Sequence, residues 1–195
     1  MGPLSEQMKT MLDIAHRNAL TLSRLINDLL DFEKITAGKL HLELQQQVLQ
    51  PLLEQAVEST RAFGERLNVS FHLESPSDPI AVQVDGNRLQ QVLVNLLSNA
   101  AKFSTAGGQV EIIASIHAMS VRISVIDHGA GIPDEFRQRI FQRFSQADSS
   151  DTRKQGGSGL GLAISKELVE SMNGQIGFTS KVGEGSCFYF ELPMY

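Results

Sequence analysis

The sequence contains one cysteine, no apolar run that approaches a membrane span and no excess of basic residues. A single cysteine, Cys187, excludes a disulfide framework and is typical of a protein in a reducing cytosol. Crossing a bilayer takes about 20 consecutive apolar residues, and neither such a run nor a signal peptide is present. We therefore expect a cytoplasmic segment without membrane contact. The net charge of −5 argues against a nucleic-acid surface, which normally has a basic face.

The sequence that is present divides into two parts. Residues 1–37 are dominated by one predicted helix, 5–36, which contains neither glycine nor proline. Its seam positions recur at steps of three and four, and they are Met8, Met11, Ala15, Asn18, Leu22, Leu25, Leu29 and Phe32. Leu12, Ala19 and Ile26 widen this seam, which favours a helical bundle over a two-stranded coiled coil. Because one helix cannot bury its own seam, we predict a homodimer formed through 5–36.

Residues 38–195 mix the periodicities of strands and helices. Strands are predicted at 39–44, 69–74, 80–84, 109–117, 120–127, 174–180 and 186–193. Helices are predicted at 50–63, 86–102, 133–140 and 159–172. This order predicts an α/β sandwich of the α+β class, in which helices cover one face of a mixed sheet.

An acidic residue followed by glycines ends the predicted strand 120–127. The string consists of Asp127, His128, Gly129, Ala130, Gly131, Ile132 and Pro133. A carboxylate at the tip of a strand, next to backbone without Cβ atoms, suits recognition of a planar ligand that forms hydrogen bonds. A β-turn closed by the side chain of Asp127 has the same sequence features, so the string alone does not decide between the two.

A second signal is the polar face of the predicted helix 86–102. Its apolar stripe consists of Leu89, Val92, Leu93, Leu96 and Ala100, whereas a different face carries Gln91, Asn95, Asn99 and Lys102. An ordinary solvated face would carry better helix formers than asparagine. Amide oxygens beside a positive charge suit Mg²⁺ bound together with substrate phosphates. An unremarkable amphipathic helix is the alternative.

Glycines at the start of the predicted helix 159–172 form a third signal. The segment reads Gly156, Gly157, Ser158, Gly159, Leu160 and Gly161. Backbone N–H groups at a helix N-terminus bind phosphate, although a flexible linker has the same composition. Neither a Rossmann turn nor a P-loop fits, because no βαβ unit leads into the segment and no lysine with a hydroxyl residue follows its last glycine.

Taken together, the chain resembles the ATP-binding catalytic domain of sensor histidine kinases of two-component systems. Residues that resemble the N, G1, F and G2 boxes of the family occur in the family's order at 95–103, 127–133, 141–144 and 157–161. The resemblance covers essentially the whole chain, since 174–193 looks like the closing strands. It implies the Bergerat fold for residues 38–195. It identifies 1–37 as the second helix of the dimerisation and phosphoacceptor hairpin.

The resemblance implies that Asp127 accepts a hydrogen bond from the adenine amino group of ATP, with Phe103 and Ile132 as apolar walls. Further residues of the nucleotide site would be Gly129, Gly131, Phe144, Gly157, Ser158, Gly159, Leu160 and Gly161. The glycines of the G2 box would offer backbone to the phosphates.

At the phosphates, the resemblance implies that Asn99 holds Mg²⁺, with Asn95 as a second candidate, and that Lys102 neutralises charge. The catalytic candidates are therefore Asn95, Asn99, Lys102 and Arg143. Arg153 and Lys154 are further candidates for the γ-phosphate, with an ordinary solvated lid as the alternative for all three basic residues.

No histidine of the chain fits the acceptor motif of the family. The histidines are His16, His41, His72, His117 and His128, and none is followed by Glu or Asp with a nearby Pro. His16 lies on the predicted long helix, but residues 23–31 resemble the family's second helix instead. We interpret His16 as a bundle-surface residue and expect no phosphohistidine on this chain. Met1–Pro3 would lie in the turn between the two helices.

These interpretations predict the ATP-binding part of an enzyme that transfers the γ-phosphate to a histidine and, through it, to the receiver domain of a response regulator. Gyrase-type and chaperone ATPases place a glutamate where this chain has Asn95, and an amide cannot take a proton from water at neutral pH. The helix 5–36 argues against serine-directed kinases of the anti-sigma type. A nucleotide-binding module without kinase activity is the other alternative.

Overall fold

The structure is a computed structural model that describes residues 5–145 and 159–195. The chain forms two compact units, Met1–Leu40 and His41–Tyr195. The division into a dimerisation helix, 1–37, and a catalytic domain, 38–195, stays a prediction.

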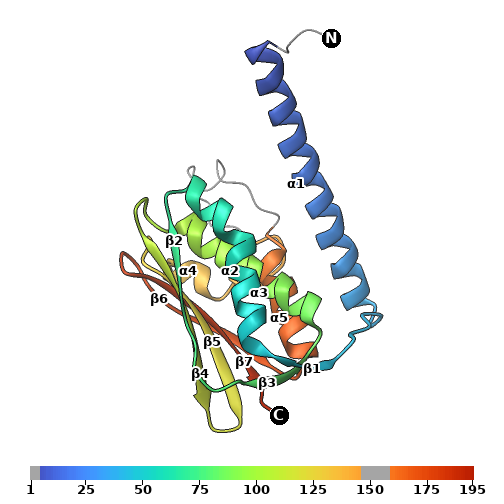
Figure 1. Cartoon of the computed structure of the whole chain (residues 1–195). Coiled ribbons are helices and arrows are strands. Elements are labelled where there is room, and N and C mark those ends of the chain that lie inside the picture. The colour runs from blue at the N-terminus through green and yellow to red at the C-terminus, as the bar shows by residue number, and fades with distance from the viewer. Residues whose placement is uncertain (1–4, 146–158) are drawn as a thin grey trace. The chain divides into compact units, whose positions relative to one another are not determined.

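The first unit is the helix α1 (Glu6–Thr36), shown in Figure 1. Ser5 caps its start, because the hydroxyl accepts a hydrogen bond from the backbone N–H of Met8 at 3.3 Å. After the helix, Gly38 has a φ of +63°, a left-handed conformation that ends many helices. Large apolar side chains are exposed along α1: Met8, Met11, Leu12, Ile14, Leu22, Leu25, Ile26, Leu29 and Leu30.

The second unit contains both strands and helices. Its strands are β1 (Gln45–Val48), β2 (Ser70–Glu74), β3 (Ala81–Val84), β4 (Gln109–His117), β5 (Ser120–Asp127), β6 (Gln175–Lys181) and β7 (Gly185–Pro193). Its helices are α2 (Leu49–Arg66), α3 (Gly86–Phe103), α4 (Asp134–Arg137) and α5 (Gly161–Ser171).

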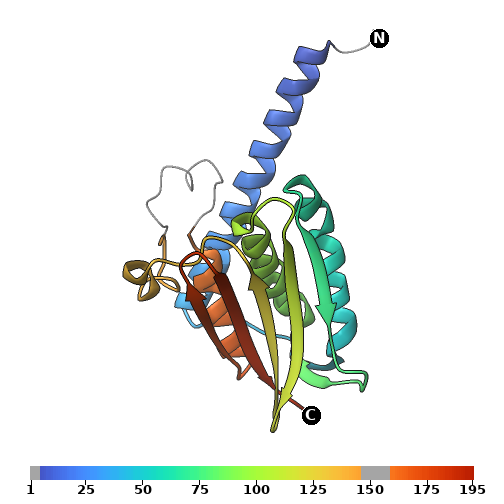
Figure 2. The ribbon, with the colours of Figure 1, turned by 90° about the vertical axis from the view of Figure 1, so that its left-hand side faces the viewer.

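Five of these strands form a mixed sheet in the order β2-β4-β5-β7-β6. Strands β2 and β4 are parallel, and the other neighbours are antiparallel. A small second sheet pairs β1 with β3. Helices α2, α3 and α5 lie on one face of the large sheet, and among the described residues of this unit no helix covers its other face (Figures 1 and 2). The predicted mixed sheet with helices on one face is therefore confirmed.

Alternation along the strands decides which side chains form the core. On β5, Val121, Ile123 and Val125 are buried, and Ile123 pairs in register with Phe190 of β7. The predicted apolar stripe of α3 lies beneath the sheet, with Leu89, Val92, Leu93, Leu96 and Ala100 all buried. Burying one such side chain contributes roughly 1.5–3 kcal/mol, so this face fixes the register of β5 and the rotation of α3.

Two predicted elements differ from the structure. The predicted strand 39–44 is wrong, because its leucines alternate in burial but no neighbouring strand pairs with it. The strand partner of β3 is instead β1, a glutamine-rich segment without a strand-like pattern of its own. The predicted helix 133–140 is confirmed only for its first turn, α4, after which the chain continues in turns. For residues 39–44, the lack of a pairing strand thus outweighs the local alternation of the sequence.

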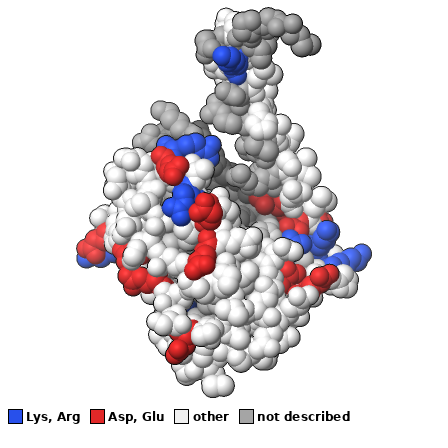
Figure 3. Space-filling view, in the orientation of Figure 1, with Lys and Arg blue, Asp and Glu red and all other residues white. Residues whose placement is uncertain are grey.

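The described surface carries charges of both signs. Figure 3 shows acidic side chains interspersed among the lysines and arginines on the face in view, without a continuous basic surface. Within residues 5–145 and 159–195, no helix combines the length and the apolar character that a membrane span requires. Cys187 on β7 is half-buried, and burial raises the pKa of its thiol.

Candidate functional site

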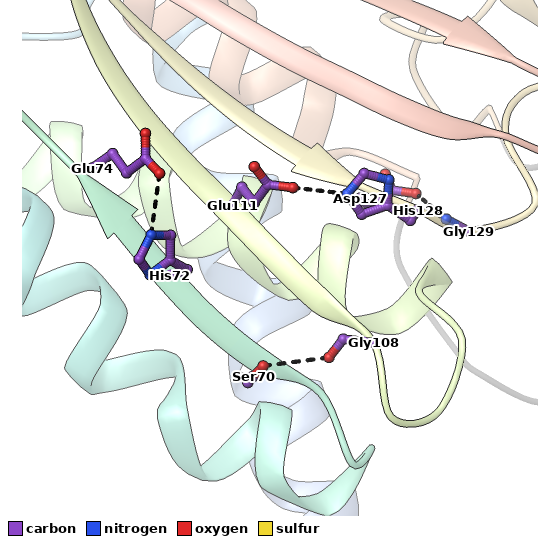
Figure 4. Close-up of polar contacts among 8 residues, drawn as sticks. All are labelled: Ser70, His72, Glu74, Gly108, Glu111, Asp127, His128 and Gly129. Carbon is purple, nitrogen blue, oxygen red and sulfur yellow. Dashed lines mark hydrogen bonds and ion pairs between the residues drawn. The ribbon is translucent and has the colours of Figure 1, made fainter.

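Asp127 is the last residue of β5, and its side chain is 5% exposed. Its Oδ1 accepts a hydrogen bond from the backbone N–H of Gly129 at 2.9 Å, as Figure 4 shows. Burial raises the pKa of the carboxyl group, while hydrogen bonds from the backbone of Gly129 and Ser186 and the nearby His128 act in the opposite direction. A carboxylate has two acceptor oxygens, so Asp127 retains acceptor capacity for an N–H group of a ligand.

The loop after Asp127 is pressed against two other segments. A Cβ at Gly129 would overlap the carbonyl oxygen of Phe103, the last residue of α3. A Cβ at Gly131 would overlap the carbonyl oxygen of Lys181 at the end of β6, and the φ of Gly131 is +70°. Both positions therefore require glycine. These contacts bring the end of α3, the acidic loop and the β6–β7 hairpin together.

Ile132 is anchored to the same hairpin. Its backbone N–H donates to Oγ of Ser180 at 2.8 Å, and the Ser180 hydroxyl donates to the carbonyl oxygen of Gly185 at 2.9 Å. The hydroxyls of Ser180 and Ser186 lie 3.1 Å apart. The Ile132 side chain is 9% exposed. The predicted apolar wall is therefore held in place by Ser180, a residue that the sequence analysis missed.

Amide side chains of α3 meet helix α5. Asn95 and Asn99 are half-buried and one helical turn apart, as predicted. Nδ2 of Asn95 donates to Oγ of Ser165 on α5 at 2.9 Å, and Nδ2 of Asn99 donates to Oδ1 of Asn95 at 3.5 Å. These bonds make a chain from α5 through Asn95 to Asn99. Ser165 was not among the predicted site residues, because a serine inside an apolar helix gives no signal by itself.

Gly161 packs directly against a side chain of α3. It is the first residue of α5, and a Cβ there would overlap Oδ1 of Asn95. The glycine therefore lets the amide of Asn95 approach the N-terminus of α5, where backbone N–H groups lack helical partners. The sequence analysis assigned Gly161 to phosphate contact alone and did not foresee this packing role.

Lys102 and Phe103 form the last turn of α3. The Nζ atom of Lys102 lies 4.9 Å from the centroid of the Phe103 ring, a cation–π distance. Burial lowers the pKa of Lys102, and Phe103 is 46% exposed. Because the Phe103 carbonyl abuts Gly129, this positive charge and this aromatic ring belong to the same site as Asp127.

The segment before residue 146 is anchored by Phe141. Its ring packs edge-on against Phe178 and Phe188 of the sheet, with centroids 6.0 and 6.5 Å apart. Phe144 is exposed and has a φ of +55°, and its backbone lies where a Cβ of Gly159 would be. Phe144 and Gly159, which flank residues 146–158 in the sequence, therefore lie against each other.

Other predicted site residues are placed as follows. Leu160 is 3% exposed, and Arg143 is exposed before residue 146. Four predicted residues lie outside the described residues: Arg153, Lys154, Gly157 and Ser158. His16 is exposed on α1.

A polar pair on the uncovered face of the sheet adjoins the site. Nε2 of His128 lies 2.8 Å from Oε1 of Glu111 on β4, as Figure 4 shows, and His72 bonds Glu74 in the same region. Glu111 pairs in register with Ile126, the residue before Asp127. Successive residues of a strand point to opposite faces, so Glu111, with which His128 pairs, lies on the face opposite to Asp127. The pair ties the start of the acidic loop to β4.

Together, these groups suit a purine nucleotide. The buried carboxylate and its apolar neighbours can hold a hydrogen-bonding base, and the amides and lysine can hold phosphates with a hard cation. Among residues 5–145 and 159–195, no group of three or more His, Cys, Asp or Glu could hold a metal ion.

Comparison with known proteins agrees with this geometry. Residues 84–195 match the family model of histidine kinase-, DNA gyrase B- and HSP90-like ATPases. The chain is 37% identical over 200 residues to the signal transduction histidine-protein kinase BarA of Escherichia coli K12, covering 98% of this chain and 21% of BarA. The chain thus spans about a fifth of the length of that curated relative.

Solved structures give the same result. Full-length ShkA in complex with AMPPNP superposes with a TM-score of 0.83 at 32% identity, covering 99% of this chain and 40% of that one. The catalytic domain of the histidine kinase ThkA matches with a TM-score of 0.67 at 28% identity, covering 77% and 95%. ThkA in complex with the response regulator TrrA matches with a TM-score of 0.75 at 24% identity, covering 100% and 53%, which shows a shared fold.

Proposed function

Because the chain belongs to the family of histidine kinase-, DNA gyrase B- and HSP90-like ATPases, we propose that it is the ATP-binding catalytic part of a sensor histidine kinase. In this role it transfers the γ-phosphate of ATP to a histidine on a dimerisation helix, for relay to an aspartate of a response regulator. The observation that carries the proposal is the meeting of buried Asp127, the amide face of α3 and the glycine start of α5 in one site.

At the base, the Asp127 carboxylate accepts a hydrogen bond from the adenine amino group and so selects adenine over guanine. A charge-assisted hydrogen bond of this kind contributes about 1.5–3 kcal/mol. Phe103 and Ile132 form the apolar walls. Gly129 and Gly131 allow the backbone of the loop to pack against the carbonyl groups of Phe103 and Lys181. Phe144 is a further residue of the nucleotide site.

At the phosphates, Asn99 holds Mg²⁺, with Asn95 as the second candidate. Mg²⁺ supplies charge neutralisation and orientation of the phosphates, which is most of what phosphoryl transfer requires. Lys102 adds a positive charge, and its lowered pKa reflects the desolvation that also strengthens its interaction with anions. Gly157, Ser158, Gly159, Leu160 and Gly161 offer backbone N–H groups, and Arg143 contacts the γ-phosphate.

The acceptor histidine comes from another helix. The exposed apolar residues of α1 are suited to a helical bundle, and we propose that the parent protein is a homodimer through this helix. The parent's partner is the receiver domain of a response regulator, a proposal supported by the complex of ThkA with TrrA. We further propose that this part of the parent works in the cytoplasm, where ATP and response regulators are found.

A calorimetric titration with Mg²⁺-ATP tests the proposal, using the wild-type chain, Asp127→Asn and Asn99→Ala. We expect the wild type to bind, Asp127→Asn to lose about 10- to 100-fold in affinity, and Asn99→Ala to bind without benefit from Mg²⁺. Circular dichroism shows whether each variant is folded. A folded wild type that binds no ATP contradicts the proposal. A chain that binds ATP but transfers phosphate to no supplied acceptor helix would instead be a nucleotide-binding module without kinase activity.

A further inference from the structure

We propose that Ser165 is a positioning residue for the metal end of the site. Its hydroxyl orients the amide of Asn95, and Asn95 in turn directs the oxygen of Asn99 toward the cation. The inference rests on the proposed function, because it concerns the Mg²⁺ that accompanies ATP. It also decides between the two candidates for the Mg²⁺ ligand: Asn99 is the ligand, and Asn95 orients the Asn99 amide without coordinating the metal.

The first observation is the burial of the Ser165 hydroxyl. Ser165 is 1% exposed on α5, between the buried residues Ile164 and Leu168. Burying a hydroxyl is unfavourable unless it forms hydrogen bonds, and an apolar residue would fill this helix face at no such cost. The hydroxyl accepts from Nδ2 of Asn95 at 2.9 Å, across 70 positions of sequence. The packing of α3 against α5 therefore includes the polar pair Asn95–Ser165, where two apolar side chains would otherwise be expected.

The second observation is the direction of the Asn95 amide. Its oxygen lies against Gly161, at the N-terminus of α5, where the helix dipole favours an oxygen over an NH₂ group. Its nitrogen is directed to Ser165. The two contacts agree, since each favours the same orientation of one planar group. With Ser165 and Gly161 in place, the amide has one preferred direction.

The consequence reaches Asn99 one turn later. The oxygen of Asn95 accepts from Nδ2 of Asn99 at 3.5 Å, so the nitrogen of the Asn99 amide is directed toward Asn95. The Asn99 oxygen is then the atom that remains for a cation. A flipped Asn99 would present its NH₂ group, which donates hydrogen bonds and cannot ligate Mg²⁺. Orientation of this amide therefore decides whether Asn99 can ligate the cation.

The test measures the ATP affinity of the full chain with Mg²⁺ and with EDTA. The ratio of the two affinities is the Mg²⁺ enhancement. For Ser165→Ala we expect this ratio to fall about three- to tenfold, the effect of one lost buried hydrogen bond, while the affinity in EDTA changes less than about twofold. Ser98→Ala is the matched control, because the Ser98 hydroxyl donates to the backbone carbonyl of Asn95 at 3.1 Å and leaves its amide alone. We expect its ratio to equal that of the wild type.

The outcomes separate this inference from the proposed function. An unchanged Mg²⁺ enhancement in Ser165→Ala, with a wild type that binds ATP, overturns the role of Ser165 and leaves the proposed function standing. An equal loss in EDTA and in Mg²⁺ shows a merely structural role and also overturns it. A wild type that binds no ATP overturns both. Ser165→Thr restores the hydroxyl, and recovery of the enhancement in a folded Ser165→Thr supports the inference.

Discussion

Around Asp127, the site is built from backbone packed against backbone, whereas around Asn99 it is built from side-chain hydrogen bonds between two helices. Gly129 and Gly131 lie against carbonyl groups of Phe103 and Lys181, and there is no room for a Cβ. Asn95 instead meets Ser165 through atoms at the ends of side chains. Backbone cannot yield to a new atom without moving a whole segment, but a side-chain amide can rotate. We therefore expect substitutions to affect folding at the first place and ligand binding at the second.

Gly131→Ala should have the largest effect. Its φ of +70° makes any L residue unfavourable, and its Cβ would overlap the Lys181 carbonyl. Gly183→Ala is the matched control, because Gly183 has a φ of +82° with nothing within 4 Å of its Cβ position. We expect Gly183→Ala to lower the free energy of unfolding by about 1 kcal/mol through backbone strain alone. Gly131→Ala should lower it by roughly 3 kcal/mol or more, since strain and overlap add.

Urea unfolding monitored by circular dichroism measures both values. Equal destabilisation by the two substitutions would show that the contact with Lys181 contributes nothing. It would contradict the expectation that backbone packing near Asp127 makes substitutions there costly for folding.

Gly161→Ala should have a smaller effect on folding and a clear one on binding. Its Cβ would meet the movable amide of Asn95 rather than backbone. Alanine is also the better helix former by up to about 1 kcal/mol, which offsets part of the cost. We expect the free energy of unfolding to stay within about 1 kcal/mol of the wild-type value. In ATP titrations we expect the Mg²⁺ enhancement to fall roughly tenfold. Equal losses with Mg²⁺ and with EDTA would show that the substitution acts through the phosphate contact of Gly161 and not through Asn95.

The smallest expected effect is the change of stability and of ATP affinity with pH that titration of the Asp127 carboxyl group causes. Burial raises the pKa of this carboxyl group, so the folded state binds its proton more tightly than the unfolded state. Stability of the wild type relative to Asp127→Asn should therefore fall as the pH rises from about 4, the unfolded value, through the raised pKa, and stay constant above it. ATP affinity should change in the opposite sense, because only the carboxylate accepts the adenine hydrogen bond without a competing proton.

The measurement is a pH series of urea unfolding and of ATP binding for both proteins. Phosphate groups of ATP titrate equally in the two, so the ratio of wild-type to variant affinity isolates Asp127. A ratio that does not decline toward acid pH would contradict the proposed role of the carboxylate at the base.

Local pattern by itself determined the elements that have one buried face. Strands β4 and β5 have the predicted bounds, because buried positions alternate along most of each strand and burial of one face leaves one register. The predicted helix over 86–102 is confirmed to within one residue, α3 ending at Phe103, for the corresponding reason at helical spacing. The family resemblance, which the comparisons confirm, also came from short motifs in a fixed order.

Tertiary structure alone decided which of these elements touch. The wrong strand at 39–44 has suitable alternation but no partner, and β1 has a partner without the alternation. The contacts of Ser165 with Asn95, of Ser180 with Ile132 and of Gly129 with Phe103 join residues far apart in sequence. A serine or glycine carries no mark of its distant neighbour, since hydrogen bonding and close approach depend on distances that exist only after the chain has folded. The residue types of the site were therefore readable in the sequence, and their orientation was not.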